Sequence, residues 1–235
     1  MTFAIMLSGG TGQRMGTTIK IPKQYIETSG KPIVCRTLQV LQDSPKIDVI
    51  VIVAAKEWHG QIHAWNDLYG MTKVKAVVTG GDSRQESIFQ GLKACARISL
   101  KDDDVVIIHD AVRPLVSEKL IEACLAPIPL HEGCMPVLPL KDTVYVSDDG
   151  KHIDQLLDRN LLYAGQAPEA FLLVPYFNAH QNASQQELHE TKGSSEIAFK
   201  KGLDVCMIPG DEANFKITTT KDLEHYEAIL ASKSN

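Results

Sequence analysis

The sequence predicts an α/β fold with a mostly parallel, twisted sheet, and three observations carry this prediction. Short apolar runs typical of buried strands recur at FAIML, IDVIVIVAA and DDDVVIIHD. Segments with helical apolar spacing, such as KPIVCRTLQVLQDS and RQESIFQGLKACARI, alternate with these runs. Glycine-rich turns directly follow two of the expected strands. This alternation is typical of an open parallel sheet packed against helices.

The remaining elements of this part of the chain fit the same pattern. IDVIVIVAA is a continuous β-branched run, which indicates a parallel strand covered on both faces. HGQIHAWNDLYG predicts a helix, and VKAVVTG predicts a strand that ends at Gly80 and Gly81. No repeat or linker divides the sequence, so we expect residues 1–235 to form a single domain with one core.

The pattern changes in the stretch CMPVLPLKDTVYVSDDGKHIDQLLDRNLLYAGQAP. An Asp-Asp-Gly turn lies there between two extended pieces, which predicts a projecting β-hairpin arm at about residues 136–164. Apolar residues on a projecting hairpin need cover. We therefore expect the arm to be the place where a second subunit docks.

The composition excludes several classes of protein. With 44% hydrophobic and 23% charged residues, and no stretch apolar enough to cross a bilayer, we expect a soluble globular protein without a membrane partner. The N-terminus lacks the basic region of a secretory signal, and the five cysteines never show C-x-x-C spacing, so we expect free thiols in the cytoplasm. A net charge of -5 gives no general attraction for nucleic acid.

Three polar clusters lie where predicted strands end. They span Ser8–Arg14, Gly80–Ser87 and His109–Arg113. Ligands of open α/β sheets bind beyond the carboxyl ends of the strands. We therefore expect these distant loops to converge on one binding site.

The first cluster resembles a phosphate cradle without matching a single known type. Gly10, Gly12 and Gly16 miss the dinucleotide-binding spacing by one residue, and no G-K-[ST] ends the turn as in a Walker A loop. Arg14 and Lys23 can both reach phosphates, and two cations beside backbone N–H donors suggest a triphosphate. A plain tight turn with surface charges remains the alternative.

Six motifs then follow in order, and together they resemble one enzyme family. They are S-G-G-x-G-x-R-M-G with P-K-Q-Y, then G-G-D-S-R-x-x-S, H-D-A-V-R-P, K-D-T, D-R-N-x-L-Y-x-G-Q-x-P and N-F-K-I-T-T-x-x-D-L. The set, over about residues 3 to 225, is similar to the cytidylyltransferases that build CDP-activated polyols. The resemblance implies a Rossmann-like nucleotidyltransferase fold, homodimeric through the arm, with CTP as a substrate and Mg²⁺ as a cofactor.

The implied reaction transfers CMP from CTP to a polyol phosphate, with release of pyrophosphate. A phosphate with a second pKa of about 6 is already largely ionised at neutral pH, so the attack needs no general base. Catalysis then depends on alignment and on neutralising charge in the transition state.

The resemblance also assigns roles to individual residues. Arg14, Lys23 and Lys216 are implied to be catalytic, with Lys23 reaching the α-phosphate. Asp110, Arg113, Thr143 and Arg159 are implied to meet the polyol phosphate, the last two from the partner's arm, and Asp110 also to hold Mg²⁺. The implied CTP contacts are Leu7, Ser8, Gly9, Gly10, Gly12, Gly81, Asp82, Arg84, Ser87 and Ala111.

Other interpretations of these residues stay open. Ser and Asp in GGDSR are typical caps of a helix, Asp110 is a typical turn residue at a strand end, and His109 is expected to be structural. Two other classes remain as alternatives, a NAD-dependent oxidoreductase and a non-catalytic nucleotide-binding module. The oxidoreductase lacks a convincingly placed ribose-binding acid, and the binding module would not need Lys23 and Asp110.

Several positions depart from the family pattern. Ala167 stands where the family usually has a hydroxyl residue, Glu169 where it has Gln, and Thr191–Gly193 where a Thr-Asp pair is common. The stretch GTTIKI after Met15 is also longer than usual. GGTG, the Val of HDAVRP and LYAGQ favour the branch that uses D-ribitol 5-phosphate over the branch that uses 2-C-methyl-D-erythritol 4-phosphate.

Overall fold

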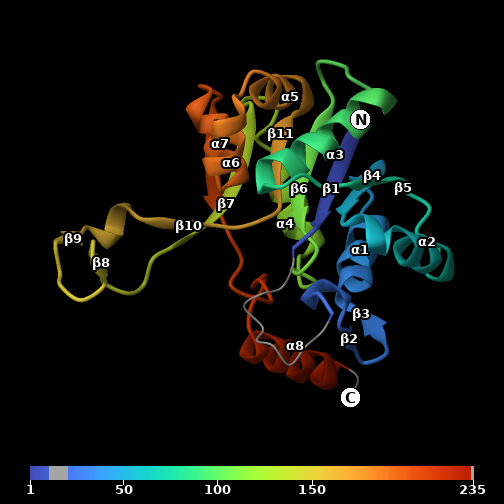
Figure 1. Ribbon diagram of the computed structural model, residues 1–235, viewed down its shortest axis with the longest axis horizontal. Helices are drawn as coiled ribbons and strands as arrows, with labels where there is room; N and C mark the ends of the chain where they lie inside the picture. Colours follow the sequence, from blue (N-terminus) through green and yellow to red (C-terminus); the bar gives the residue numbers. More distant parts are fainter. Residues whose placement is uncertain (11–20, 234–235) are drawn as a thin grey trace.

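A sheet of eight strands forms the centre of the described part of the protein (Figure 1). The computed structural model describes residues 1–10 and 21–233. The strand order is β10-β7-β11-β6-β1-β4-β5, and β12 pairs with β7. The strands are β1 (Thr2–Ser8), β4 (Val49–Ala54), β5 (Val74–Thr79), β6 (Val105–Asp110), β7 (Gly133–Pro139), β10 (Tyr163–Gly165), β11 (Glu169–Leu172) and β12 (Val205–Pro209).

The first-half strands are parallel, as the sequence predicts. β6, β1, β4 and β5 run in one direction, in the register Leu7 to Val53 and Leu7 to Asp110. β11 is antiparallel to both β6 and β7. The prediction of an α/β fold with a mostly parallel sheet is confirmed.

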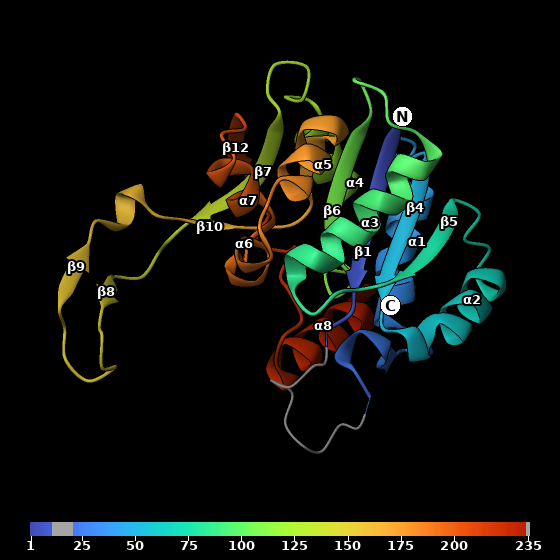
Figure 2. The same ribbon diagram turned by 45° about the horizontal axis from the view of Figure 1, so that its top comes forward.

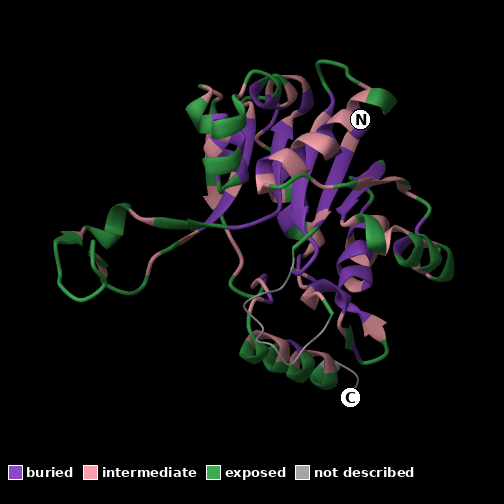
Figure 3. Ribbon diagram, viewed as in Figure 1, coloured by how far each residue is buried: buried purple, intermediate pink, exposed green. Residues whose placement is uncertain are grey.

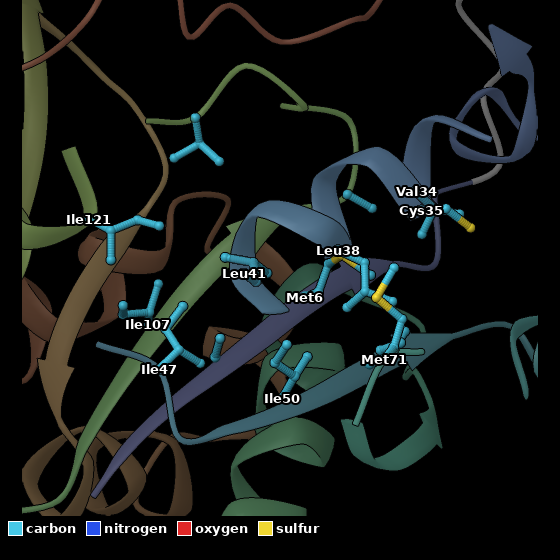
Figure 4. Packing of buried hydrophobic residues seen from close by; sticks show 14 of the residues in the cluster. Met6, Val34, Cys35, Leu38, Leu41, Ile47, Ile50, Met71, Ile107 and Ile121 are labelled. Atoms are coloured by element: carbon cyan, nitrogen blue, oxygen red, sulfur yellow. The ribbon is translucent and has the colours of Figure 1, made fainter. Parts of the chain in front are cut away.

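Successive side chains of a strand point to opposite faces of the sheet. Because the central strands are apolar at successive positions, both faces are covered by helices. In β1, Ala4 and Met6 face a core shared with α1, α2 and α4, whereas Phe3 and Ile5 face a core shared with α3, α5, α6 and α7. Figure 4 shows Met6 among residues of the first core, including Leu38 and Leu41 of α1. The helices are α1 (Ile33–Asp43), α2 (His59–Leu68), α3 (Arg84–Ile98), α4 (Glu118–Leu125), α5 (Leu173–Gln181), α6 (Gln185–Glu190) and α7 (Ser194–Lys200).

The C-terminal helix α8 (Thr220–Lys233) closes a smaller third core beside the carboxyl end of the sheet. Tyr226 of this helix and Ile217 before it pack with Val112 and Ile33. The Ile217 N–H donates to the Val112 carbonyl at 3.0 Å. This contact fixes the neighbouring Lys216 beside the end of β6. Two short strands, β2 (Glu27–Thr28) and β3 (Lys31–Pro32), pair with each other just ahead of α1 in the sequence.

The hairpin arm projects away from the sheet, as Figures 1 and 2 show on the left. Its strands β8 (Val144–Val146) and β9 (Gln155–Leu157) pair with each other and not with the central sheet. Gly150 in the turn has φ +69°, a conformation that favours glycine. Most of the arm is exposed in Figure 3, and exposed apolar side chains on it include Ile153, Leu156 and Leu161.

The five cysteines are free, as expected, and Cys206 is the one that is not fully buried. Within residues 1–10 and 21–233, no helix has the length and apolar character needed to span a membrane.

Candidate active site

A cavity of about 740 Å³ opens at the carboxyl edge of the parallel strands. It contains side chains from all three of the predicted polar clusters. The lining residues are Leu7, Ser8, Gly9, Gly10, Lys23, Gln24, Val53, Gly81, Asp82, Ser83, Arg84, Ser87, Asp110, Val112, Arg113, Gly165, Gln166, Ala167, Glu169, Lys192, Gly193, Ser194 and Lys216. The convergence of loops that the sequence predicts is therefore present.

Asp110 is the centre of an ion-pair cluster inside this cavity. Its Oδ1 lies 2.9 Å from Arg84 Nη1, and its Oδ2 lies 3.0 Å from Lys216 Nζ and 3.3 Å from Arg113 Nε. The Asp110 side chain is only 7% exposed. Three cations from three separate segments are thus gathered on one buried acid.

The balance of these charges sets the ionisation of Asp110. Burial alone would raise its pKa, but the nearby Arg84, Lys216 and Arg113 outweigh burial and hold the pKa well below the ordinary value of 3.8. Asp110 is therefore ionised at neutral pH. The lining side chains within the described residues also carry more cations than acids, which suits a ligand rich in phosphate.

His109 belongs to the scaffold and not to the cavity. It is fully buried, and its Nε2 donates to the Arg113 carbonyl at 3.3 Å. Burial lowers the pKa of His109 to about 4. The imidazole is therefore neutral at pH 7 and braces the turn after β6, in agreement with a structural role.

The GGDSR loop both caps a helix and lines the cavity. The Ser83 hydroxyl accepts from the Glu86 N–H, and Glu86 Oε2 accepts from the N–H groups of Ser83 and Asp82, which makes a capping box at the start of α3. At Gly81, an added Cβ would lie 2.3 Å from the Glu86 Cβ. The loop therefore requires glycine there, and the two interpretations of this motif are compatible.

The segment Thr191–Ser195 closes another side of the cavity. Gln85 Nε2 donates to the Gly193 carbonyl at 2.7 Å, and Arg84 Nη2 donates to the Ser194 hydroxyl at 3.2 Å. The Ser195 N–H donates to Glu169 at 2.8 Å, and the Ser195 hydroxyl donates to the same oxygen. These bonds place Lys192 on the cavity wall.

Glu169 is a second buried acid in the cavity. Burial raises its pKa above the ordinary value of 4.5, and this effect exceeds the lowering by the Ser195 hydrogen bonds and by Arg84. Ala167 also lines the cavity and is 3% exposed, and its carbonyl accepts from Asn214 Nδ2 at 2.7 Å. Both departures from the family pattern are thus located at the site.

Most of the sequence-predicted site residues that the structure describes lie together, but three do not. Ala111 is 1% exposed and lies in the core, outside the cavity lining, and its carbonyl accepts from the Thr37 hydroxyl, so its contact with CTP stays a prediction. Thr143 and Arg159 are exposed on the arm, outside this cavity. Gly12 and Arg14 fall outside the described residues, as does most of GTTIKI. The predicted residues that line the cavity are Leu7, Ser8, Gly9, Gly10, Lys23, Gly81, Asp82, Arg84, Ser87, Asp110, Arg113 and Lys216.

Some lining residues are not among the predicted contacts. Gln24, Ser83 and Gln166 lie inside the sequence motifs PKQY, GGDSR and LYAGQ. Membership of these motifs is therefore the sequence signal that points to them. Lys192 and Ser194 come from a segment that departs from the family pattern. Contacts across more than a hundred residues place this segment, and no local spacing reveals them.

The mostly parallel sheet has a cation-rich cavity beyond the carboxyl ends of its strands. Glycines after the first strand and Lys23 lie in the wall of this cavity, and this arrangement is typical of an α/β enzyme that handles nucleotides. Comparison with known proteins makes the class specific. Residues 2–232 match the family model described as IspD, 2-C-methyl-D-erythritol 4-phosphate cytidylyltransferase. The chain belongs to this family and is a cytidylyltransferase of the nucleotidyltransferase class.

Individual relatives carry two different names. The chain is 32% identical over its whole length to a ribitol-5-phosphate cytidylyltransferase of Streptococcus agalactiae, covering 98% of that protein. It is 35% identical to a 2-C-methyl-D-erythritol 4-phosphate cytidylyltransferase of Halalkalibacterium halodurans, covering 99% of each. A crystal structure of 4-diphosphocytidyl-2C-methyl-D-erythritol synthase from Anaerococcus prevotii matches with a TM-score of 0.79 at 27% identity, over 98% of this chain and 96% of that one. Overall identity thus does not distinguish the two branches.

Proposed function

We propose that this enzyme transfers CMP from CTP to D-ribitol 5-phosphate and forms CDP-ribitol and pyrophosphate. One observation carries the choice of polyol: each of the three motifs that favour the ribitol branch contributes to the cavity wall. Gly9, Val112 and Gly165 are all part of its wall. At Gly165 an added Cβ would lie 2.8 Å from Met135 Sδ, so even alanine would need Met135 to move. The alternative substrate is 2-C-methyl-D-erythritol 4-phosphate.

The cavity supports a mechanism based on alignment and charge. The phosphate oxygen of the polyol attacks the α-phosphorus of CTP in line, the bond from this phosphorus to the bridging oxygen breaks, and pyrophosphate leaves with that electron pair. Lys23, with Arg14, neutralises the triphosphate, and the glycine turn supplies backbone donors. Arg113 and Lys216 orient the attacking phosphate. Asp110 holds these two side chains in place and needs no proton transfer.

A divalent cation fits poorly at Asp110. Both carboxylate oxygens already contact Arg84, Arg113 or Lys216, and an added cation would meet their repulsion. Among the described residues, no group of three or more His, Cys, Asp or Glu side chains lies close enough to hold a metal. We therefore assign Asp110 to holding Arg84, Arg113 and Lys216 in place, and no step of the mechanism is derived through a metal.

We also propose a homodimer in which each arm completes the partner's site. Thr143 and Arg159 lie outside the cavity of their own subunit, and Arg159 Nη1 donates to the Lys141 carbonyl within the arm. Exposed apolar side chains on the arm, such as Leu156 and Leu161, would be covered by a second subunit. A monomer would then lack two of the residues expected to meet the polyol phosphate.

A panel of polyol phosphates tests the proposed substrate. Pyrophosphate release from CTP is measured with ribitol 5-phosphate and with methylerythritol 4-phosphate, and kcat/KM is compared for the wild type and Val112→Ala. We expect the wild type to prefer ribitol 5-phosphate by at least about tenfold, a difference of about 1.4 kcal/mol in transition-state binding, and Val112→Ala to reduce this ratio. Preference of the wild type for methylerythritol 4-phosphate would assign the enzyme to the other branch.

A further inference from the structure

Two side chains of the short helix η2 (Lys23–Tyr25) hold Ser8–Gly10, the part of the glycine turn after β1 that the structure describes. Gln24 Nε2 donates to the Ser8 carbonyl at 2.8 Å and to the Gly10 carbonyl at 2.9 Å. The Tyr25 hydroxyl donates to the Ser8 carbonyl at 3.1 Å and accepts from the Ser8 hydroxyl at 3.2 Å. Gln24 and Tyr25 are each 3% exposed, so both side chains are buried beneath the turn residues that they contact.

These bonds decide where the peptide groups of the turn point. In a trans peptide the C=O and the next N–H point in opposite directions. Holding the Ser8 carbonyl toward Gln24 therefore directs the Gly9 N–H away from Gln24. Ser8, Gly9 and Gly10 all line the cavity, so these bonds hold a part of the cavity wall in place without a ligand. Preorganised donors cost less to order when an anion binds.

The same side chain couples the turn to Lys23. Lys23 and Gln24 are consecutive residues of η2, and both line the cavity. A shift of the turn relative to η2 would break both bonds of Gln24. The backbone donors and the lysine are therefore fixed relative to each other, although they lie 13 or more residues apart in the sequence.

An aromatic stack anchors this arrangement to the neighbouring strand. The Tyr25 ring stacks on Trp58 with centroids 3.9 Å apart and an angle of 23° between the rings, and Trp65 of α2 lies 5.9 Å from Tyr25. Trp58 belongs to the short helix η3 (Lys56–Trp58), which follows β4. The support behind the turn thus extends to the carboxyl end of the next strand in the sheet.

We infer that Gln24 is a positioning residue, braced by Tyr25, that holds Ser8–Gly10 and Lys23 together as one preformed part of the site for the CTP triphosphate. The inference rests on the proposed location of CTP and not on the identity of the polyol. Gln24 acts through the two carbonyl groups and through Lys23. It does not act by donating to CTP, because both hydrogen bonds of its side-chain nitrogen go to the protein.

The test uses the full-length protein and CTP alone, with binding measured by calorimetry in a buffer containing Mg²⁺. Gln24→Met keeps the length of the side chain and removes both donated bonds. Gln42→Met is the matched control, because Gln42 on α1 also bridges two groups, the Thr72 hydroxyl and the Lys73 N–H, but lies outside the cavity. We expect Gln24→Met to raise the Kd for CTP by about 10- to 100-fold and the control to leave it unchanged.

Steady-state kinetics separate positioning from general loss of structure. Gln24→Met should raise KM for CTP and lower kcat, while KM for the polyol phosphate stays unchanged. Tyr25→Phe keeps the stack on Trp58 and loses one hydroxyl, so it should weaken CTP binding less, and it serves if Gln24→Met does not fold. If the wild type binds CTP and both variants bind it equally well, the inference is wrong and the proposed function stands. If the wild type does not bind CTP, the proposed function fails and the inference fails with it.

Discussion

The two buried acids of this site, Asp110 and Glu169, differ in ionisation because their surroundings differ. Asp110 keeps its charge because three cations surround it, whereas Glu169 has serine donors and one more distant arginine, and burial dominates its ionisation. The sequence places Asp110 at the ligand edge, since it ends a predicted strand. It does not predict its partners, because Arg84 and Lys216 are 26 and 106 residues away and meet it only through the tertiary fold.

The raised pKa of Glu169 predicts a pH dependence of stability. The native state keeps the proton above pH 4.5, where the unfolded chain has released it, so the free energy of unfolding falls as the pH rises through this region. Glu169→Gln keeps the acceptor for Ser195 but cannot ionise. We therefore expect the variant to gain stability relative to the wild type as the pH rises from 4.5 toward neutral, which urea unfolding at several pH values measures.

The control for this prediction is Asp103→Gln, which changes an exposed acid on a loop. It should follow the pH profile of the wild type. Parallel profiles for the wild type and Glu169→Gln would show that Glu169 is not a buried acid with a raised pKa.

The sequence predicts an element well where the conformation of that element depends on residues close to it in the chain. The Asp-Asp-Gly turn predicted the hairpin arm, and Gly150 at positive φ is the physical reason. The segment Thr191–Ser195 shows the opposite case. Its role in the cavity depends on Gln85, Arg84 and Glu169, which lie far away in the sequence, so no local pattern could identify it.

The arm carries a prediction about subunit cooperation. Lys23→Ala and Arg159→Ala are made in separate chains with different tags, co-expressed, and purified as a mixed dimer. One site then combines an intact Lys23 with an intact Arg159 from the partner, so we expect about half of the wild-type activity. Each variant alone should be nearly inactive when pyrophosphate release is measured at low polyol phosphate.

If each arm instead serves the cavity of its own subunit, each site of the mixed dimer carries one of the two substitutions. Activity would then stay at the level of the single variants, and a monomeric wild type in sedimentation would exclude the dimer directly.

For the whole molecule, the sequence predicted the parallel half of the sheet and the edge where the site lies. Continuous apolar strands alternating with amphipathic helices specify that half strongly. The antiparallel placement of β11 between β6 and β7 was not predicted, because β11 is a four-residue strand whose pairing depends on the assembled core. The family match from residue 2 to 232 agrees with a site built from both halves of the chain.

The most direct measurement is identification of the product by mass spectrometry, after incubation of the enzyme with CTP, Mg²⁺ and ribitol 5-phosphate. We expect CDP-ribitol and pyrophosphate in equal amounts from the wild type, and a loss of both by at least about 100-fold in Lys23→Ala, because a charge that stabilises the transition state is removed. The thermal unfolding of the variant should match that of the wild type. Absence of CDP-ribitol from the wild-type reaction, or wild-type turnover in Lys23→Ala, would contradict the account.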